Sequence, residues 1–405
     1  MRFRSTNRDT AIIVAALVVG LCGRSMALPP YSFTRIADDT GPFETFFTPQ
    51  INNHGRVVFV AVTDSLDVGV HVGDGGPLTT IADNSGVIRN FACCPSINDA
   101  GTVAFSASPT AGGAAIYSGN GGPLALRVDS SGPFGIFGAA VGINNSNEVA
   151  FWANTDAGGE GIYRISATGG LTTIADDAGP FDSFPSSLSL NESGRVAFTA
   201  TMDSGVRGVY SGTGGPTATI ADNTGPLDGF FGAAINDGGE VGFAASGPAV
   251  YTGSGGPLTL VADDSGAYFQ FDAPALNHVG DVVFFASLDA GGEGIFFGDD
   301  AVVDKLIQVG DPLDGSIVTN LPLTGGPKEL SVNEMGQVVF RADLADGRRG
   351  LYRADPIPEP HTLVLLMLAG GAFLWRRQRL QHHQCRRTGT LKKENSRDVC
   401  YSSSF

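Results

Sequence analysis

The sequence predicts an all-β protein, a seven-bladed β-propeller whose seventh blade is completed by strands from both ends of the domain. Three observations predict this fold. A turn followed by an apolar strand occurs seven times, each repeat contains four short segments with strand character, and the first and last repeats are complementary fragments. A period of about 45 residues with four strands per repeat is typical of propeller blades.

The repeated turn has the pattern Asn-x-x-Gly. Its successive copies are 46, 46, 47, 45, 41 and 56 residues apart. The copies begin at Asn52, Asn98, Asn144, Asn191, Asn236, Asn277 and Asn333. The fourth position is Gly in six copies and Asn147 in the other. Since Gly and Asn tolerate a positive φ, we expect a left-handed backbone at this position.

Each repeat is expected to form four strands, here named a to d. In the first repeat, strand a ends near Ile51, and "RVVFVA", "VGVHVG" and "PLTTIAD" follow as strands b, c and d. Alternation and β-branched residues favour strands over helices. Residues 31–37 form a strand d without its a, b and c, whereas the last repeat has a, b and c only. We therefore expect residues 31–37 to pair with residues 350–353 and close the ring, which removes two exposed sheet edges.

The composition limits the possible partners. Of 405 residues, 42% are apolar, and 57 Gly and 22 Pro without a collagen-like period indicate turns. Residues 28–355 contain 37 Asp or Glu against 13 Lys or Arg. A body this acidic repels nucleic acid and suits water, cations or basic partners.

The two ends have the features of targeting segments. Arg2, Arg4 and Arg8 precede an apolar run at 11–22, and Ala27 lies where a signal peptidase would cleave. Near the other end, Pro358-Glu359-Pro360 precedes an apolar run at 362–375, which is followed by Arg376-Arg377. This run predicts a short transmembrane helix with the arginines on the cytoplasmic side.

The Pro-Glu-Pro motif, the short apolar run and the arginine pair, in this order, resemble the PEP-CTERM sorting signal of Gram-negative bacteria. The resemblance covers residues 358–379. It implies recognition by an exosortase, transient anchoring in the inner membrane, and release to the cell envelope or extracellular matrix. The repeats resemble the propeller-like tandem repeats of other PEP-CTERM proteins, whose biochemical role is not established. Such signals normally end the chain, whereas residues 380–405 follow here.

Four segments result. We expect a signal peptide at 1–27, the propeller at 28–355, a sorting and anchor segment at 356–379, and a disordered basic tail at 380–405.

The connections between strand d and the next strand a carry an aspartate in six copies, as in "IADDTGPF". These residues are Asp38, Asp83, Asp129, Asp176, Asp222 and Asp263. Turn capping by the carboxylates is favoured over individual Ca²⁺ sites, because Ca²⁺ needs six to eight oxygens and the Asp-x-Asp-x-Asp-Gly loop is absent. No cofactor or metal site is predicted, with Ca²⁺ as the alternative. Together the carboxylates give one face a negative potential that could attract a cation or a basic ligand.

Catalytic motifs are scarce. The body contains three histidines, and no Gly-x-Ser-x-Gly, His-Glu-x-x-His or Walker sequence occurs. Glu160 and Glu293, in twin "DAGGEG" loops, are the carboxylates that depart most from the repeat, and we interpret both as solvated. The vicinal pair Cys93-Cys94 is interpreted as a small buried pair rather than a redox site.

The sequence therefore favours an exported, transiently anchored propeller that acts as a binding or structural module in the cell envelope or exopolysaccharide matrix. No catalytic residue is predicted. Its expected partners are an exosortase-type processing enzyme, the membrane, and a polysaccharide or basic surface. The alternative is a secreted glycan or lactone hydrolase that uses carboxylates of one face.

Overall fold

The computed structural model describes residues 28–185, 187–322, 330–358, 392–394 and 397–399. The chain divides into two compact units, Met1–Pro356 and Ile357–Phe405. In the second unit, β34 (Lys392–Glu394) and β35 (Arg397–Val399) form an antiparallel pair. The expected signal peptide lies outside the described residues, as do Glu359, Pro360, Arg376 and Arg377 of the expected sorting segment. Within the described ranges no helix is long and apolar enough to cross a bilayer.

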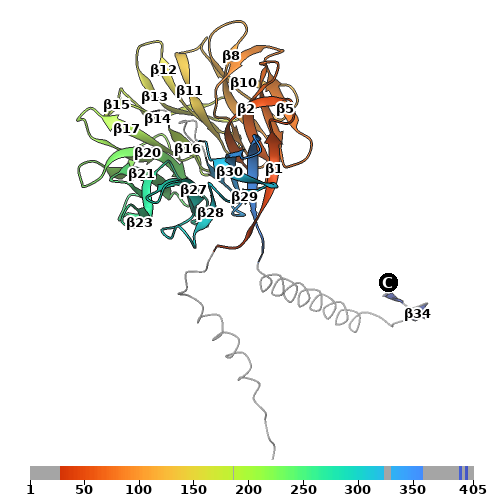
Figure 1. Ribbon diagram of the computed structural model, residues 1–405. Helices are drawn as coiled ribbons and strands as arrows, with labels where there is room; N and C mark the ends of the chain where they lie inside the picture. Colours follow the sequence, from red (N-terminus) through yellow and green to blue (C-terminus); the bar gives the residue numbers. More distant parts are fainter. Residues whose placement is uncertain (1–27, 186, 323–329, 359–391, 395–396, 400–405) are drawn as a thin grey trace, which may run out of the picture. The chain divides into compact units, whose positions relative to one another are not determined.

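The first unit is an all-β, seven-bladed propeller, as the repeats predict (Figure 1). In blades 1 to 6, strands a, b, c and d follow one another in the chain, and strand a is split in two in blades 2, 4 and 6. Blade 1 consists of β2 (Phe43–Ile51), β3 (Val57–Thr63), β4 (Val68–Gly73) and β5 (Thr79–Asp83). Blade 2 consists of β6 (Ile88–Phe91), β7 (Ser96–Ile97), β8 (Val103–Pro109), β9 (Ala115–Gly119) and β10 (Ala125–Asp129). Blade 3 consists of β11 (Phe134–Ile143), β12 (Val149–Thr155), β13 (Glu160–Ile165) and β14 (Leu171–Asp176).

Blades 4 to 6 repeat this order. Blade 4 consists of β15 (Phe181–Ser183), β16 (Leu188–Leu190), β17 (Val196–Met202), β18 (Arg207–Gly212) and β19 (Ala218–Asp222). Blade 5 consists of β20 (Asp228–Ile235), β21 (Val241–Ser246), β22 (Ala249–Gly253) and β23 (Thr259–Asp263). Blade 6 consists of β24 (Tyr268–Phe271), β25 (Ala275–Leu276), β26 (Val282–Leu288), β27 (Glu293–Phe296) and β28 (Lys305–Gln308).

Blade 7 is closed by the N-terminal strand of the propeller, as the complementary fragments predict. It contains β29 (Pro312–Leu313), β30 (Ser316–Asn320), β31 (Ser331–Val332), β32 (Val338–Leu344) and β33 (Arg349–Pro356). Strand β1 (Tyr31–Asp38) pairs antiparallel with β33, and Figure 1 shows it in red beside the blue end of the propeller. The last interval between Asn-x-x-Gly turns is 56 residues, and its additional residues include the β29–β30 hairpin.

Charged side chains reinforce this closure. Six of the eight ion pairs among the described residues join side chains of blade 7 and its flanking loops. Asp314, in the β29–β30 hairpin, contacts both Arg35 of β1 and Arg348 beside β33. Exposed ion pairs contribute roughly 0–1 kcal/mol each, so the backbone pairing and the core carry most of the closure.

Aromatic residues fill the blades. The third residue of every strand b is a phenylalanine that is at most 1% exposed: Phe59, Phe105, Phe151, Phe198, Phe243, Phe284 and Phe340. In blade 3, Phe151 packs between Phe134 of strand a and Tyr163 of strand c, with ring centroids 5.7 and 5.9 Å away. The strand-c position is Tyr in five blades, Phe296 in blade 6 and His71 in blade 1. His71 is therefore a core residue, packed between Phe43 and Phe59.

Every c–d pair also contains a register shift, a feature that the sequence did not reveal. In blade 1 the pairing jumps from Val70–Ala82 to His71–Thr80, which leaves Ile81 as the bulged residue. Shifts recur at the corresponding place in the other six blades. The isoleucine of "IAD" is thus a bulge whose side chain is buried, with Ile81 5% exposed.

The strand registers divide the connections between two ends of the propeller. The a–b and c–d turns lie at one end, which we call the asparagine face. The d–a and b–c connections lie at the other end, which we call the aspartate face.

Candidate functional site

The Asn-x-x-Gly turns form a closed ring of hydrogen bonds on the asparagine face. The Nδ2 of each first asparagine donates to the backbone carbonyl of the corresponding asparagine in the next blade, at 2.9–3.3 Å, and Asn333 returns to Asn52. Each Oδ1 accepts the backbone N–H four residues later, at 2.8–3.0 Å. All seven side chains are at most 6% exposed. The repeated asparagine therefore joins the blades rather than binding a ligand.

The left-handed position of the turn is confirmed. The fourth residue has φ between 57° and 94° in every copy, and Asn147 has 57°. Sequence reasoning identified this turn but missed the cross-blade role of its first residue. The identity of that asparagine in all seven copies was the available signal.

A second ring of bonds surrounds the first and is interrupted once. The residue after each asparagine accepts the backbone N–H of its counterpart in the preceding blade in six of seven cases. The exception is His278, the residue after Asn277. Among the bonds of the described residues, its side chain accepts none from the backbone N–H of Asp237. Here His278 and His54 are turn residues, and His54 donates its backbone N–H to Asn52 Oδ1.

On the aspartate face, five of the six predicted aspartates cap their own turns. Oδ1 accepts the backbone N–H two residues later at 2.9–3.2 Å and the hydroxyl of that Ser or Thr at 2.5–2.7 Å. These residues are Asp38, Asp83, Asp129, Asp222 and Asp263. The hydroxyl and N–H of Ser85 hold the pKa of Asp83 below its usual value. The sixth, Asp176, has Ala178 two residues later, where the other copies have a Ser or Thr hydroxyl. In this turn the N–H of Gly179 donates to the backbone carbonyl of Asp176.

These carboxylates bond locally, each within its own connection. Among the described residues no three His, Cys, Asp or Glu side chains are grouped so that they could hold a metal ion. The aspartates of the b–c loops have a backbone role as well, since Asp64, Asp156 and Asp203 donate their N–H groups to Pro42, Pro133 and Pro180. This bond folds each b–c loop over the start of strand a.

Glu160 and Glu293 connect neighbouring blades. Glu160 accepts the backbone N–H of Phe184 at 2.8 Å, and Glu293 accepts that of Leu321 at 2.9 Å. Both glutamates begin strand c of one blade and hold strand a of the next. The interpretation of these two residues as solvated loop carboxylates is therefore wrong, because their side chains satisfy backbone donors in the adjacent blade.

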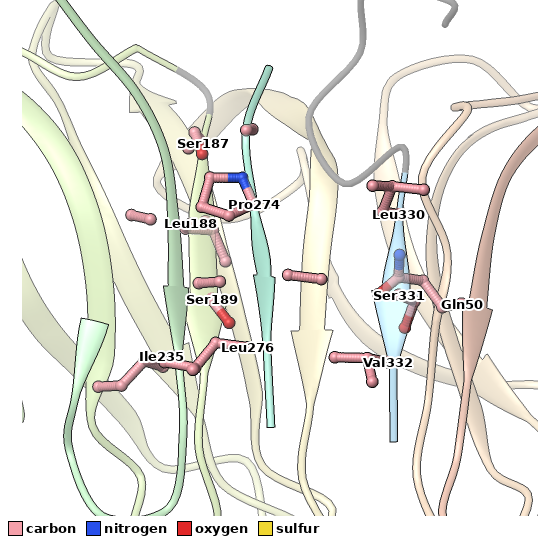
Figure 2. A pocket seen from close by; sticks show the side chains of 15 residues that line it. Gln50, Ser187, Leu188, Ser189, Ile235, Pro274, Leu276, Leu330, Ser331 and Val332 are labelled. Carbon is pink, nitrogen blue, oxygen red and sulfur yellow. The ribbon is translucent and has the colours of Figure 1, made fainter. Parts of the chain in front are cut away.

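A small cavity lies in the middle of the propeller. Its volume is about 160 Å³, and it lies between the innermost strands of blades 1, 4, 5, 6 and 7. Figure 2 shows small or apolar side chains around it, among them Ser187, Ser189, Pro274 and Ser331. Its lining contains no carboxylate. None of the six predicted aspartates is among the described residues that line this cavity.

The structure joins Cys93 and Cys94 by a disulfide bond, which the sequence interpretation did not predict. The pair lies between β6 and β7, where strand a of blade 2 approaches both neighbouring blades. Thr48 of blade 1 donates to the Cys93 carbonyl, and Cys94 forms an isolated bridge with Ala140 of blade 3.

The aspartate face contains a larger pocket between blades 5 and 6. Its volume is about 390 Å³, and it is lined by Phe231, Ala245, Ser246, Gly247, Pro248, Gln270, Phe271 and Asp272. The wall thus combines two aromatic rings with one hydroxyl, one amide and one carboxylate. Small-molecule pockets are typically apolar clefts of roughly 300–1,000 Å³ with a few polar groups.

A much smaller pocket lies between blades 1 and 7. Its volume is about 30 Å³, and its lining includes Glu44 and Asp343 together with Arg341 and Arg349. Two carboxylates thus line this pocket, which has room for little more than a water molecule.

Of three solved structures compared with this chain, one reaches a TM-score above 0.5 and supports the propeller fold. The oligogalacturonate lyase of Vibrio parahaemolyticus superposes with a TM-score of 0.52 at 12% identity, over 82% of this chain and 99% of that one. An acylaminoacyl peptidase of Pyrococcus horikoshii gives 0.49 at 11% identity over 82% of this chain, which spans 55% of the peptidase. The Aleuria aurantia lectin gives 0.37 at 10% identity over 67% of this chain and 93% of the lectin. At these identities the likeness concerns the fold alone.

A comparison of the sequence with curated proteins finds no match. Residues 34–364, which include almost the whole propeller, match a family described as "Family of unknown function (DUF7453)". The chain therefore belongs to the DUF7453 family.

Proposed function

We propose that this protein is exported and acts as a non-enzymatic binding or structural module in the cell envelope or exopolysaccharide matrix. The observation that carries the proposal is the pocket between blades 5 and 6. It combines exposed aromatic surface with single polar groups, which suits recognition of a small chemical unit. It has one carboxylate, Asp272, whereas glycoside hydrolysis uses two carboxyl groups about 5–10 Å apart.

Export is supported by features at both ends of the chain and by the disulfide. The residues that resemble a PEP-CTERM signal would direct the chain through the inner membrane to an exosortase. A disulfide between Cys93 and Cys94 suits an oxidising compartment such as the periplasm. The acidic body suits a hydrated location outside the cytoplasm and disfavours nucleic acid as a partner.

A hydrolase is the second candidate, favoured by one observation. Glu44 and Asp343 line the same small pocket between blades 1 and 7. A glycan would need that pocket to widen well beyond 30 Å³ before both carboxylates could flank a glycosidic bond.

Cell fractionation tests the proposal. The full chain is produced in a Gram-negative host that has an exosortase, beside a variant with Pro358, Glu359 and Pro360 replaced by alanine. We expect the unchanged chain in the envelope or extracellular fraction and the variant in the inner membrane. Cytoplasmic retention of both would contradict export. Release of sugars from the host's matrix polysaccharide by the purified chain would favour the hydrolase instead.

A further inference from the structure

Blade 5 differs from the other blades at its b–c connection. Blades 1, 3 and 4 fold this loop over the start of strand a by a bond from the loop aspartate to a proline carbonyl, and in blade 6 Asp289 donates to Ala267. In blade 5 the connection shrinks to Gly247 and Pro248, between β21 and β22. The cover that the other blades place over strand a is missing, and the 390 Å³ pocket opens at this place beside blade 6.

Two glycines flank the part of β20 that carries Phe231. Gly229 and Gly232 have φ of 58° and 72°, and no other described residue of a strand a has a positive φ. A Cβ at Gly232 would lie 2.6 Å from the Cβ of Ala273, and one at Gly229 would overlap Ser246 Oγ. The chain between these glycines contains Phe230 and Phe231. Phe231 is left 53% exposed at the pocket, so its ring is available to a ligand.

The polar groups of the pocket come from both blades. Ser246 belongs to blade 5, whereas Gln270 and Asp272 belong to blade 6. Asp272 Oδ1 accepts the N–H of Ala273 at 2.6 Å, and the Asp272 N–H donates to the carbonyl of Phe285 at 3.1 Å. These two bonds fix the carboxylate at the wall. The site therefore offers the exposed ring of Phe231, with hydrogen-bond donors and acceptors on Ser246, Gln270 and Asp272 around it.

This chemistry favours a neutral, polyhydroxylated ring. A ring with an apolar C–H face can cover Phe231, while its hydroxyls bond to the amide, the carboxylate and the hydroxyl. A uronate or phosphate would be repelled by Asp272 and by the acidic body. A Ca²⁺ ion would find one carboxylate where it needs six to eight oxygens.

We propose that the pocket between blades 5 and 6 binds a neutral pyranose unit of a polysaccharide. The inference rests on the proposed binding function and names the chemical class of its ligand. Phe231 supplies the surface on which the sugar ring packs, and Asp272 and Gln270 accept and donate hydrogen bonds to its hydroxyls.

Affinity electrophoresis of the full chain tests this inference. Gels contain dextran, mannan or galactan as neutral probes, or alginate as a polyuronate. We expect retardation by at least one neutral polymer and none by alginate. Phe231→Ala should weaken that binding at least tenfold, and Asp272→Asn, which keeps an acceptor for the Ala273 N–H, should weaken it severalfold.

Phe269→Ala is the matched control. Phe269 is 62% exposed in β24, next to Gln270, but does not line the pocket. We expect its binding to equal that of the unchanged chain, and circular dichroism should show that all variants are folded. Absence of retardation by every neutral polymer overturns the inference. Equal weakening in Phe231→Ala and Phe269→Ala, or binding to alginate alone, overturns it as well.

The outcome separates this inference from the proposed function. If the chain reaches the matrix and stays bound when Phe231 is replaced, the binding function stands and the pocket assignment fails. If the chain stays in the cytoplasm, the proposed function fails whatever the pocket binds in vitro.

Discussion

The two faces of the propeller use the same kind of turn residue in different ways. On the asparagine face, each buried asparagine bonds to the next blade, so that seven residues form one closed ring. On the aspartate face, five of the six aspartates accept hydrogen bonds within their own turns. A closed ring restrains every blade, whereas a local cap restrains one connection. The aspartate face can therefore lose a loop, as blade 5 has, without opening the propeller.

The largest effect is expected when the ring is broken. Asn191→Ala removes the bond to the Asn236 carbonyl and leaves the N–H of Arg195 without its side-chain acceptor. Since buried unsatisfied groups cost about 1–3 kcal/mol each, we expect a loss of about 2–3 kcal/mol in the free energy of unfolding. Urea denaturation measures it. Asp237→Ala, an exposed acceptor in the outer ring, is the control and should cost less than about 1 kcal/mol. Equal losses would contradict the special role of the inner ring.

A local cap should matter less. Asp222→Ala removes an acceptor for the N–H and hydroxyl of Thr224, and we expect a loss of about 1 kcal/mol because the site is exposed. Asp176→Ala, in the copy that lacks a Ser or Thr partner, should change stability by less than half as much. Elemental analysis of both variants should give the same Ca²⁺ content as the unchanged chain. Loss of bound Ca²⁺ in Asp222→Ala would contradict the capping interpretation.

One b–c loop departs from the others in its backbone and can be improved. Leu66 has φ of 66° and is 71% exposed, and its N–H donates to the carbonyl three residues earlier. Gly158, Gly205 and Gly291 make the same bond with positive φ in their blades. A left-handed residue with a Cβ costs about 1–2 kcal/mol, partly offset by the flexibility of glycine in the unfolded chain. We expect Leu66→Gly to stabilise the protein by about 0.5–1 kcal/mol in thermal denaturation, and destabilisation would contradict this.

The smallest effect concerns pH and the core of blade 1. Burial lowers the pKa of His71 from 6.5, although the negative charge of Asp83 partly opposes the shift. The unfolded chain therefore binds a proton more readily, and stability falls as the pH drops below 6.5 toward the folded-state pKa. His71→Tyr restores the residue found at this position in most blades and should flatten that dependence between pH 7.5 and 5.5. An unchanged slope in urea denaturation would show that other groups cause it.

The sequence by itself determined the number of blades, the closure by β1 and the left-handed turn at Asn147. These features depend on local patterns: the spacing of the repeats, the alternation of strand residues, and the residues that tolerate positive φ. The closure could be predicted from the two ends of the repeat region. A single strand d stands at the first end, and a blade that lacks its strand d stands at the second.

The tertiary structure alone decided what these repeated residues do. The bond from Asn333 to Asn52 joins residues 281 positions apart, and Glu160 and Glu293 find their backbone partners only in the next blade. The pocket beside Phe231 arises from a loop that is missing in blade 5 and from side chains of blade 6. Such contacts depend on how neighbouring blades pack against each other. The spacing of repeats along a sequence does not give the distances between side chains of different blades.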